Sequence, residues 1–501
     1  MDNRILVLVI TLLIAGAVAT ITLGALSSRA SAAPAAPAGE HRVCPSGCAY
    51  SSIQAAVDAA QPGDVIKVAQ GTYTDLHHIP SLDTATFTAT QIVAITKSIT
   101  IQGGYSSTDW DLPDPEALPT ILDAGGQGRV MVIVGNGITP IVEGLRLTDG
   151  DATGLGPFEW GDVGGGVYIK DATPVISGNQ VYSHTADRGG GLYLWYSSAI
   201  LNSNTVSNNT AGDGGGGMEL LYSPATLNGN TVSGNKAPTY SGGTWGGGVL
   251  LNSSDATLSG NTVTGNAASY GGGVAVYWSA AALNDNTVTS NSVSSYGGGL
   301  ALYGSASTLA GNLVTGNTTS RQGGGLYFWY NDSILNNTVV ADNTVNQDTG
   351  LGPGIYMGRS SLRLLHTTIA RNRGGDGSGV CVFGNYDVTV GMTNTILVSH
   401  TVGITVTAGN TATLNATLWH ANGTDRDGAG TVEHTADYAD DPAFAADGYH
   451  LTASSAAIDE GVSTDVATDI DGDARPTGDH PDLGADEFVL RHIYLPLIIR
   501  H

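Results

Sequence analysis

The chain has 501 residues, of which 41% are apolar, 13% are charged and 71 are glycine, and its formal net charge at pH 7 is -25. This composition argues against a disordered chain, which usually carries more charge and fewer apolar residues, and favours a folded β protein interrupted by glycines. The acidic balance argues against nucleic acid and anionic membrane surfaces as partners, whereas Ca²⁺ and neutral sugars suit such a surface.

Residues 1–32 have the form of an export signal. Arg4 precedes an apolar run from Ile5 to Leu26, and Ala30-Ser31-Ala32 is a sequence that a signal peptidase accepts. The run is also long enough to span a bilayer, so cleavage and a retained anchor are both open, and a membrane is a partner only if the segment is kept. We expect a secreted or surface protein of a bacterium, with residues 33–41 as a linker.

Two of the three cysteines lie close together in the sequence. Cys44 and Cys48 flank a Pro-Ser-Gly turn, and an oxidising compartment would permit a disulfide between them. Two free thiols are the alternative. The segment lacks the further Cys or His ligands of a zinc site, and Cys381 is left without a partner.

Glycine triplets recur through the middle of the chain at intervals of about 26 residues, which is typical of a solenoid. Their last members are Gly166, Gly191, Gly217, Gly248, Gly273, Gly299 and Gly325. Each triplet precedes a short strand such as Leu192-Tyr193-Leu194. We expect its first and third residues to face the core and the middle one to face solvent.

Asparagines recur with the same period, as at Asn204, Asn230 and Asn261, and most repeats have another five residues later. Asparagine tolerates left-handed backbone, and its amide can bond the equivalent amide of the next coil. We interpret these residues as turn ladders rather than as a ligand surface. Three short strands in each period predict an all-β fold, a three-sided parallel β-helix over residues 42–435.

Both ends of this region resemble known proteins. Ser52–Ala60, followed by Gly63–Val68, resembles the opening of pectin-lyase-like β-helices, while the glycine and asparagine repeats resemble surface β-helices of the polymorphic outer-membrane type. Residues 436–489 resemble a closing module of the choice-of-anchor type, and residues 490–501 form a C-terminal tail. The resemblance implies a right-handed parallel β-helix with an N-terminal capping helix and a C-terminal closing module. It specifies no activity, because this scaffold serves lyases, hydrolases and adhesins.

Carboxylates occur at two places where a cation could bind. The first set stands four residues before the last glycine of three successive triplets: Asp162, Asp187 and Asp213. Ca²⁺ would convert their mutual repulsion into ligation, whereas solvated turn residues are the alternative. The second set lies in the closing module: Asp469, Asp471 and Asp473. Turn capping or pairing with Arg475 competes with a cation there.

Aromatic residues recur at the outward positions after the triplets. The set expected to bind carbohydrate is Tyr193, Trp195, Tyr277, Tyr303, Tyr327 and Trp329, and Trp245, Tyr270 and Tyr296 recur just before three further triplets. Sugar rings pack on aromatic faces, and a row of rings suits a long chain. The alternative is that the rings cover one another or lie beneath a loop.

These features favour a non-catalytic binder of extracellular polysaccharide. One alternative is a Ca²⁺-dependent polysaccharide lyase or related carbohydrase, with Lys170, Arg188 and Glu219 as candidate catalytic residues and His184 close in sequence. That arrangement is similar to β-helix lyases, in which Ca²⁺ neutralises a uronate and Lys or Arg takes the α-proton. Lys170 as an ordinary solvated residue competes with this role. The second alternative is a structural surface protein or adhesin.

Overall fold

The computed structural model describes residues 39–78, 90–155, 162–238 and 243–490. The chain divides into Met1–Ala38 and Gly39–His501, and all described residues belong to the second unit. The predicted export signal, most of the linker and residues 491–501 of the tail therefore lie outside the described residues. Within the described ranges, no helix is long and apolar enough to cross a membrane.

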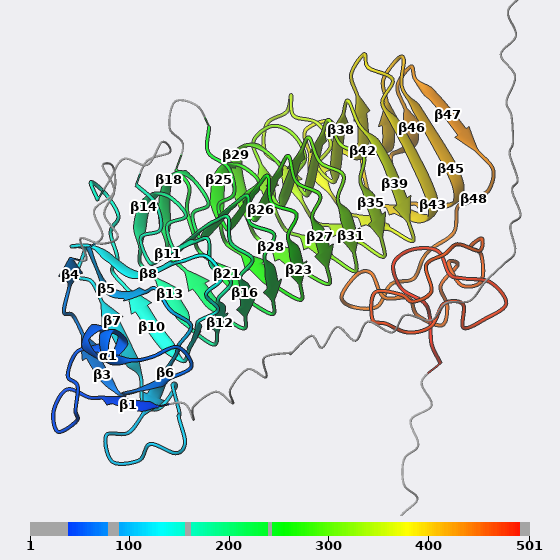
Figure 1. Cartoon of the computed structure of the whole chain (residues 1–501). Helices are drawn as coiled ribbons and strands as arrows, with labels where there is room; N and C mark the ends of the chain where they lie inside the picture. Colours follow the sequence, from blue (N-terminus) through cyan, green and yellow to red (C-terminus); the bar gives the residue numbers. More distant parts are fainter. Residues whose placement is uncertain (1–38, 79–89, 156–161, 239–242, 491–501) are drawn as a thin grey trace, which may run out of the picture. The chain divides into compact units, whose positions relative to one another are not determined.

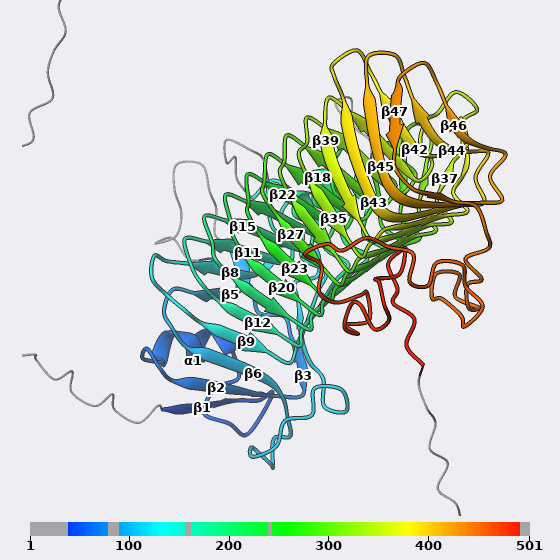
Figure 2. The ribbon, with the colours of Figure 1, turned by 90° about the vertical axis from the view of Figure 1, so that its right-hand side faces the viewer.

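Each coil of the chain contributes one strand to each of three long sides (Figures 1 and 2). Side 1 is a 14-stranded sheet, and sides 2 and 3 together form a 27-stranded sheet. Strands of successive coils pair in parallel, as β15 does with β19 and β17 with β21. The predicted all-β parallel β-helix is confirmed, with a short fourth strand added in many coils.

Side 1 consists of β4 (His77–His78), β5 (Thr90–Ile95), β8 (Arg129–Val134), β11 (Val167–Lys170), β15 (Leu192–Trp195), β19 (Met218–Leu221), β22 (Val249–Asn252), β26 (Val274–Tyr277), β30 (Leu300–Tyr303), β34 (Leu326–Trp329), β38 (Ile355–Gly358), β42 (Ser378–Phe383), β44 (Val402–Val406) and β46 (Thr424–Asp427). The short side 4 consists of β14 (Thr185–Arg188), β18 (Thr210–Gly214), β25 (Ala267–Tyr270), β29 (Ser292–Tyr296), β33 (Thr318–Thr319), β37 (Thr344–Val345) and β41 (Arg373–Gly374).

Side 2 consists of β1 (Glu40–Val43), β2 (Val65–Ala69), β6 (Thr100–Tyr105), β9 (Ile141–Glu143), β12 (Val175–Ser177), β16 (Ile200–Asn202), β20 (Thr226–Asn228), β23 (Thr257–Ser259), β27 (Ala282–Asn284), β31 (Thr308–Ala310), β35 (Ile334–Asn336), β39 (Ser361–Leu365) and β47 (Thr431–His434). Side 3 consists of β3 (Gly71–Tyr73), β7 (Thr120–Asp123), β10 (Leu145–Thr148), β13 (Gln180–Tyr182), β17 (Thr205–Ser207), β21 (Thr231–Ser233), β24 (Thr262–Thr264), β28 (Thr287–Thr289), β32 (Leu313–Thr315), β36 (Val339–Ala341), β40 (Thr368–Ala370) and β48 (Asp437–Tyr438). The long strands β43 (Thr389–Val398) and β45 (Thr411–His420) serve both sides.

The interior of the solenoid is filled by alternate residues of these strands. In the three-residue strands of sides 2 and 3 other than β3, the middle residue is buried and its neighbours point outward, as for Leu201 in β16 and Val206 in β17. Each buried Leu or Val contributes about 1.5–3 kcal/mol relative to an exposed one. A coil can bury these side chains only against the coils beside it, so the repeat stabilises itself by stacking.

The middle residue of the side 1 strands differs from the expectation. Tyr193 is 2% exposed and Tyr327 is 7% exposed, so the prediction that this position faces solvent is wrong. The reason is that the segment before each glycine triplet crosses the outer surface of side 1. Gly189, at φ 58°, reverses the chain so tightly that a Cβ added there would come within 2.8 Å of Cβ of Tyr193. The outer surface of side 1 is thereby a second, thin apolar layer.

The asparagines form the predicted ladders at the turns. Between sides 2 and 3, the backbone N–H and the side-chain Nδ2 of Asn230 both donate to Oδ1 of Asn261, at 2.9 and 3.0 Å. The same pair of bonds joins Asn204 to Asn230, and a second ladder runs parallel to the first. A third ladder, which the asparagine pattern does not predict, joins serine hydroxyls to backbone N–H groups between sides 1 and 2: Ser197, Ser223, Ser254, Ser279 and Ser305.

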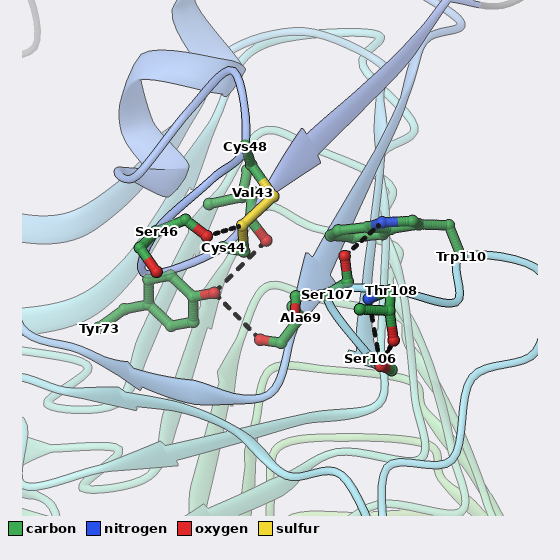
Figure 3. The surroundings of a disulfide bond; sticks show 10 residues. All are labelled: Val43, Cys44, Ser46, Cys48, Ala69, Tyr73, Ser106, Ser107, Thr108 and Trp110. Carbon is green, nitrogen blue, oxygen red and sulfur yellow. Dashed lines mark hydrogen bonds between the residues drawn. A yellow bond between two sulfur atoms is a disulfide. The ribbon is translucent and has the colours of Figure 1, made fainter.

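The N-terminal end of the core is covered as the resemblance implied. Helix α1 (Ile53–Ala59) begins after Ser52, whose hydroxyl accepts from a backbone N–H, and buries four residues against the first coils. The disulfide between Cys44 and Cys48 is present, so that prediction is confirmed (Figure 3). Tyr73 packs below it and donates to the Ala69 carbonyl at 3.0 Å (Figure 3). Cys381 is a buried free thiol.

After β48 the chain turns back along side 3 as a segment with almost no regular structure, drawn in orange and red (Figure 2). Leu451, Ala457 and Leu483 of this closing segment pack against Val339 and Ile396 of side 3. Its backbone also bonds to the solenoid, because Gly484 N donates to the Asn394 carbonyl at 2.9 Å. The segment therefore covers the outer surface of side 3 in its C-terminal part.

Candidate functional site

The three aspartates before the triplets lie on successive coils, and the carboxylates of Asp162 and Asp187 bond to backbone. Asp187 Oδ2 accepts from the backbone N–H of Asp162 at 3.2 Å, and Asp162 Oδ2 accepts from the N–H of Gly154. Asp213 is exposed. In the described part of the chain, the one group of three ligand side chains whose atoms converge within 4.8 Å lies elsewhere, in the closing segment. These contacts correspond to the turn interpretation for Asp162 and Asp187.

Of the three candidate catalytic residues, the structure brings two together. Arg188 and Glu219 form a two-pronged ion pair, in which Nε donates to Oε2 at 2.9 Å and Nη2 contacts Oε1. Glu219 is completely buried at the middle position of β19. Lys170 lies at the end of β11, where its ammonium is 3.7 Å from Asp171 and 4.8 Å from the ring centre of Trp195.

The electrostatics of the Arg188–Glu219 pair follow from its burial. Burial raises the pKa of Glu219 in spite of the neighbouring guanidinium. Burial also disfavours the charge on Arg188, but the carboxylate outweighs it and raises the pKa of the guanidinium. Each group is therefore the other's counter-ion, and together they support the packing of the outer layer on side 1.

His184 lies at the N-terminal end of the second asparagine ladder. Its Nδ1 accepts from Gly150 N at 2.8 Å, and its Nε2 donates to the Leu147 carbonyl at 3.0 Å. Burial lowers the pKa of this imidazole to about 3. The ring thus takes the position of one more ladder asparagine and stays neutral.

Rings from two sequence positions merge into one exposed group, which we call the aromatic strip: Trp245, Tyr270, Tyr277, Trp278, Tyr296, Tyr303, Trp329 and Tyr330. Trp245 stacks on Tyr270 with ring centres 4.5 Å apart and touches Tyr277 at 5.3 Å. All eight rings keep some exposure, and the largest values are 55% for Trp278 and 44% for Tyr330. The rings thus cover one another in part and still form a surface.

The backbone conformation sets the direction of the two most exposed rings of the strip. Trp278 and Tyr330 have φ of 49° and 52°, in the left-handed region, and directly follow the side 1 strands β26 and β34. The Trp278 ring lies over Gly304 of the next coil, where an added Cβ would come within 2.5 Å of the indole. The ring is held in place before any ligand arrives.

Of the six aromatic residues predicted to bind carbohydrate, Tyr277, Tyr303 and Trp329 belong to the strip. Trp195 lies in a smaller group with Tyr196 and Tyr222, with ring centres 5.6 and 5.2 Å apart. The other two, Tyr193 and Tyr327, form the buried floor beneath these rings, and burial raises the pKa of both phenols.

The three closing-segment aspartates do not converge either. Asp469 is buried and accepts from the backbone N–H groups of Asp471 and Asp473, at 2.9 and 2.8 Å, which is a turn-capping role. Arg475 pairs with Glu487 at 3.1 Å.

Asp471 points instead toward His450 and Asp486, and these three residues are the group whose ligand atoms lie within 4.8 Å. The imidazole of His450 is already bonded on both sides, to Asp447 at 2.6 Å and to Asp471 at 2.8 Å. Burial raises the pKa of Asp486 to about 6.

Comparison with known proteins supports the fold. A family model described as the right-handed β-helix region matches residues 158–319 and 248–418, which together span more than half of the chain. No curated protein matches the chain. Among solved structures, the crystal structure of pectate lyase Pel9A is similar at 13% identity over 90% of this chain and 97% of that one, with a TM-score of 0.28, and no conclusion about activity follows from it. The chain therefore belongs to the right-handed β-helix family.

Proposed function

We propose that this protein binds a polysaccharide outside the cell through the aromatic strip. The observation that carries the proposal is the convergence of eight rings from successive coils into one partly exposed surface. A protein does not usually leave so many neighbouring aromatic rings in water unless they meet a partner. Sugar rings present C–H faces that pack on aromatic rings, while tyrosine hydroxyls bond the sugar hydroxyls.

The dimensions of the strip suit a chain rather than a single sugar. Coils lie about 4.8 Å apart, so rings spread over four coils extend for roughly 15 Å along the solenoid. The rings are held by mutual stacking and by the contact of Trp278 with Gly304, so little side-chain freedom is lost on binding. The formal net charge of -25 favours a neutral polymer over an acidic one.

Export is part of this proposal. It is supported by the apolar segment of residues 5–26 and by the disulfide between Cys44 and Cys48, which is typical of oxidising compartments. Binding without catalysis is supported by the pairing of Arg188 with Glu219, because each of these groups is occupied by the other.

Retention of the full chain on a panel of insoluble polysaccharides tests the proposal. We expect one polymer to retain the protein, and Trp278→Ala and Tyr330→Ala each to raise its Kd at least about tenfold, because truncating an aromatic anchor costs about 2 kcal/mol. Leu112→Ala is the control, since Leu112 is a highly exposed apolar side chain outside the strip.

Three outcomes would contradict the proposal in different ways. If no polymer retains the parent, or if both ring variants bind as the parent does, a structural or adhesive role takes its place. If uronic acid polymers yield products that absorb in the ultraviolet, and a chelator stops their release, the protein is a Ca²⁺-dependent lyase. In that case, a loss of kcat in Lys170→Ala that exceeds the loss of binding would show that Lys170 is the catalytic base.

A further inference from the structure

Side 3 carries a regular array of hydroxyl groups on its outer surface. In four successive strands the middle valine is buried and the two flanking residues point outward with partial exposure. All eight outward residues have hydroxyl groups: Thr205, Ser207, Thr231, Ser233, Thr262, Thr264, Thr287 and Thr289. We call this array the hydroxyl face.

The array is regular in two directions. Thr205, Thr231, Thr262 and Thr287 stand in register, and the second residue of each strand forms a parallel row, with no register shift between these four coils. Neighbouring coils repeat at about 4.8 Å, and outward residues of one strand are about 6.6 Å apart. Threonine is stiff at χ1, so its hydroxyl and methyl groups keep fixed directions. No charged side chain interrupts either row.

The same rows change character where another part of the chain covers them. Continuing along side 3, the outward residues become Leu313 and Thr315, then Val339 and Ala341, then Thr368 and Ala370, and then Ile396 and Val398. The strands β36 and β40 are buried on both faces, and the apolar residues among these form the contact with the closing segment. Apolar residues thus predominate beneath the closing segment, where Thr368 accepts a hydrogen bond from Ala485 N at 3.0 Å, and hydroxyls stand where the face is open. The open part lacks the apolar side chains that the closing segment packs against.

We propose that the hydroxyl face binds ice. Its hydroxyls repeat at about 4.8 Å from coil to coil and at about 6.6 Å along a strand, so they form a two-dimensional grid of fixed donors and acceptors on which a lattice of ordered water can build. Uncharged hydroxyls can join such a lattice as donors and acceptors, and the methyl groups between them occupy its hollows. A protein or an anionic polymer would need apolar or basic side chains, and the eight residues of the face include neither. This function is independent of the aromatic strip, which lies on side 1 and side 4.

Ice recrystallisation and thermal hysteresis of the full chain test the inference. We expect the parent to slow recrystallisation and to be incorporated into growing ice. Thr262→Lys and Thr287→Lys should each abolish both effects, because a long charged side chain prevents close approach of the lattice. Ser292→Lys is the matched control, since Ser292 is an exposed hydroxyl residue of the same coil as Thr287 but lies on side 4. Circular dichroism melts establish that each variant is folded.

Two results would overturn the inference. If the parent is excluded from ice as an inert protein is, threonine stands on side 3 only because it suits exposed strands. Alternatively, Ser292→Lys could lose the activity while Thr287→Lys keeps it, in which case another surface binds ice. Polysaccharide retention by the same variants stays at the parent's level if the two functions are separate.

Discussion

Replacing Asn261 by alanine removes one rung from the buried ladder between sides 2 and 3. Its Oδ1 accepts from Asn230 N at 2.9 Å, and its Nδ2 donates to the Leu227 carbonyl at 2.9 Å. Both partners are backbone groups in the interior and lose the ladder bond together. A buried polar group left without a partner costs about 1–3 kcal/mol, so we expect the free energy of unfolding to fall by about 2–6 kcal/mol.

Urea denaturation followed by far-ultraviolet circular dichroism measures this change. Asn228→Ala is the matched control, because Asn228 lies two residues before the ladder on the outer surface, where its Nδ2 donates to Asn202 at 3.1 Å. Surface substitutions of this kind change stability by about 0.5 kcal/mol. If Asn261→Ala costs no more than Asn228→Ala, the ladders do not stabilise the turns and the reasoning fails.

Three further predictions concern stability. Since burial lowers the pKa of His184 from about 6.5 to about 3, the unfolded chain binds the extra proton between these values, and stability falls as pH drops through this range. His184→Asn keeps the ladder contacts and should make this loss smaller between pH 7 and pH 4 in parallel denaturation curves, while the buried His366 and His400, whose pKa values are also lowered, keep their shares of it. Arg188→Met should lower the free energy of unfolding by about 3–5 kcal/mol, because it leaves Glu219 buried and unpaired. The double variant with Glu219→Leu should recover most of this loss, and urea midpoints measure both changes. Leu302→Asp should prevent soluble expression, because its coil is covered only by its neighbours; soluble, β-rich protein from this variant would contradict that expectation.

The repeat of the solenoid could be predicted because it depends on local sequence patterns. The period of the glycine triplets gives the length of a coil, and the alternation around residues such as Val206 gives the inward side of each strand. Asn204 and its equivalents mark the turns, since a side-chain amide satisfies buried backbone groups only if the next coil supplies the same amide. These rules act between adjacent coils, which the sequence places in order.

The burial of Tyr193 could not be read from the same alternation. Alternation decides which side of a strand faces the core, but it does not say whether another segment crosses the opposite side. That cover depends on the reversal at Gly189, whose positive φ the sequence permits without requiring. For a related reason, the sequence does not show that the two sets of aromatic residues form one strip, because Trp245 and Tyr277 meet only once the coil is closed.

The sequence places His184 near the candidate catalytic residues, but it also contains a signal for a structural role. His184 stands five residues after Asn179, the spacing that separates the two ladder asparagines in the following coils. Aligned in this way, the imidazole is a ladder residue, and its hydrogen bonds to Gly150 and Leu147 agree with that position. Alignment within the repeat is thus a better guide to role here than proximity in sequence to charged residues.

The role of the aromatic strip is tested most directly by a crystal structure of the protein with an oligosaccharide from the polymer that retains it. We predict sugar rings stacked on Trp278 and Tyr330 and following the strip from coil to coil, with Tyr193 untouched beneath the surface. An oligosaccharide bound instead beside Lys170 and Asp187, with the strip empty, would contradict the account and return the acidic residues to the centre of the function.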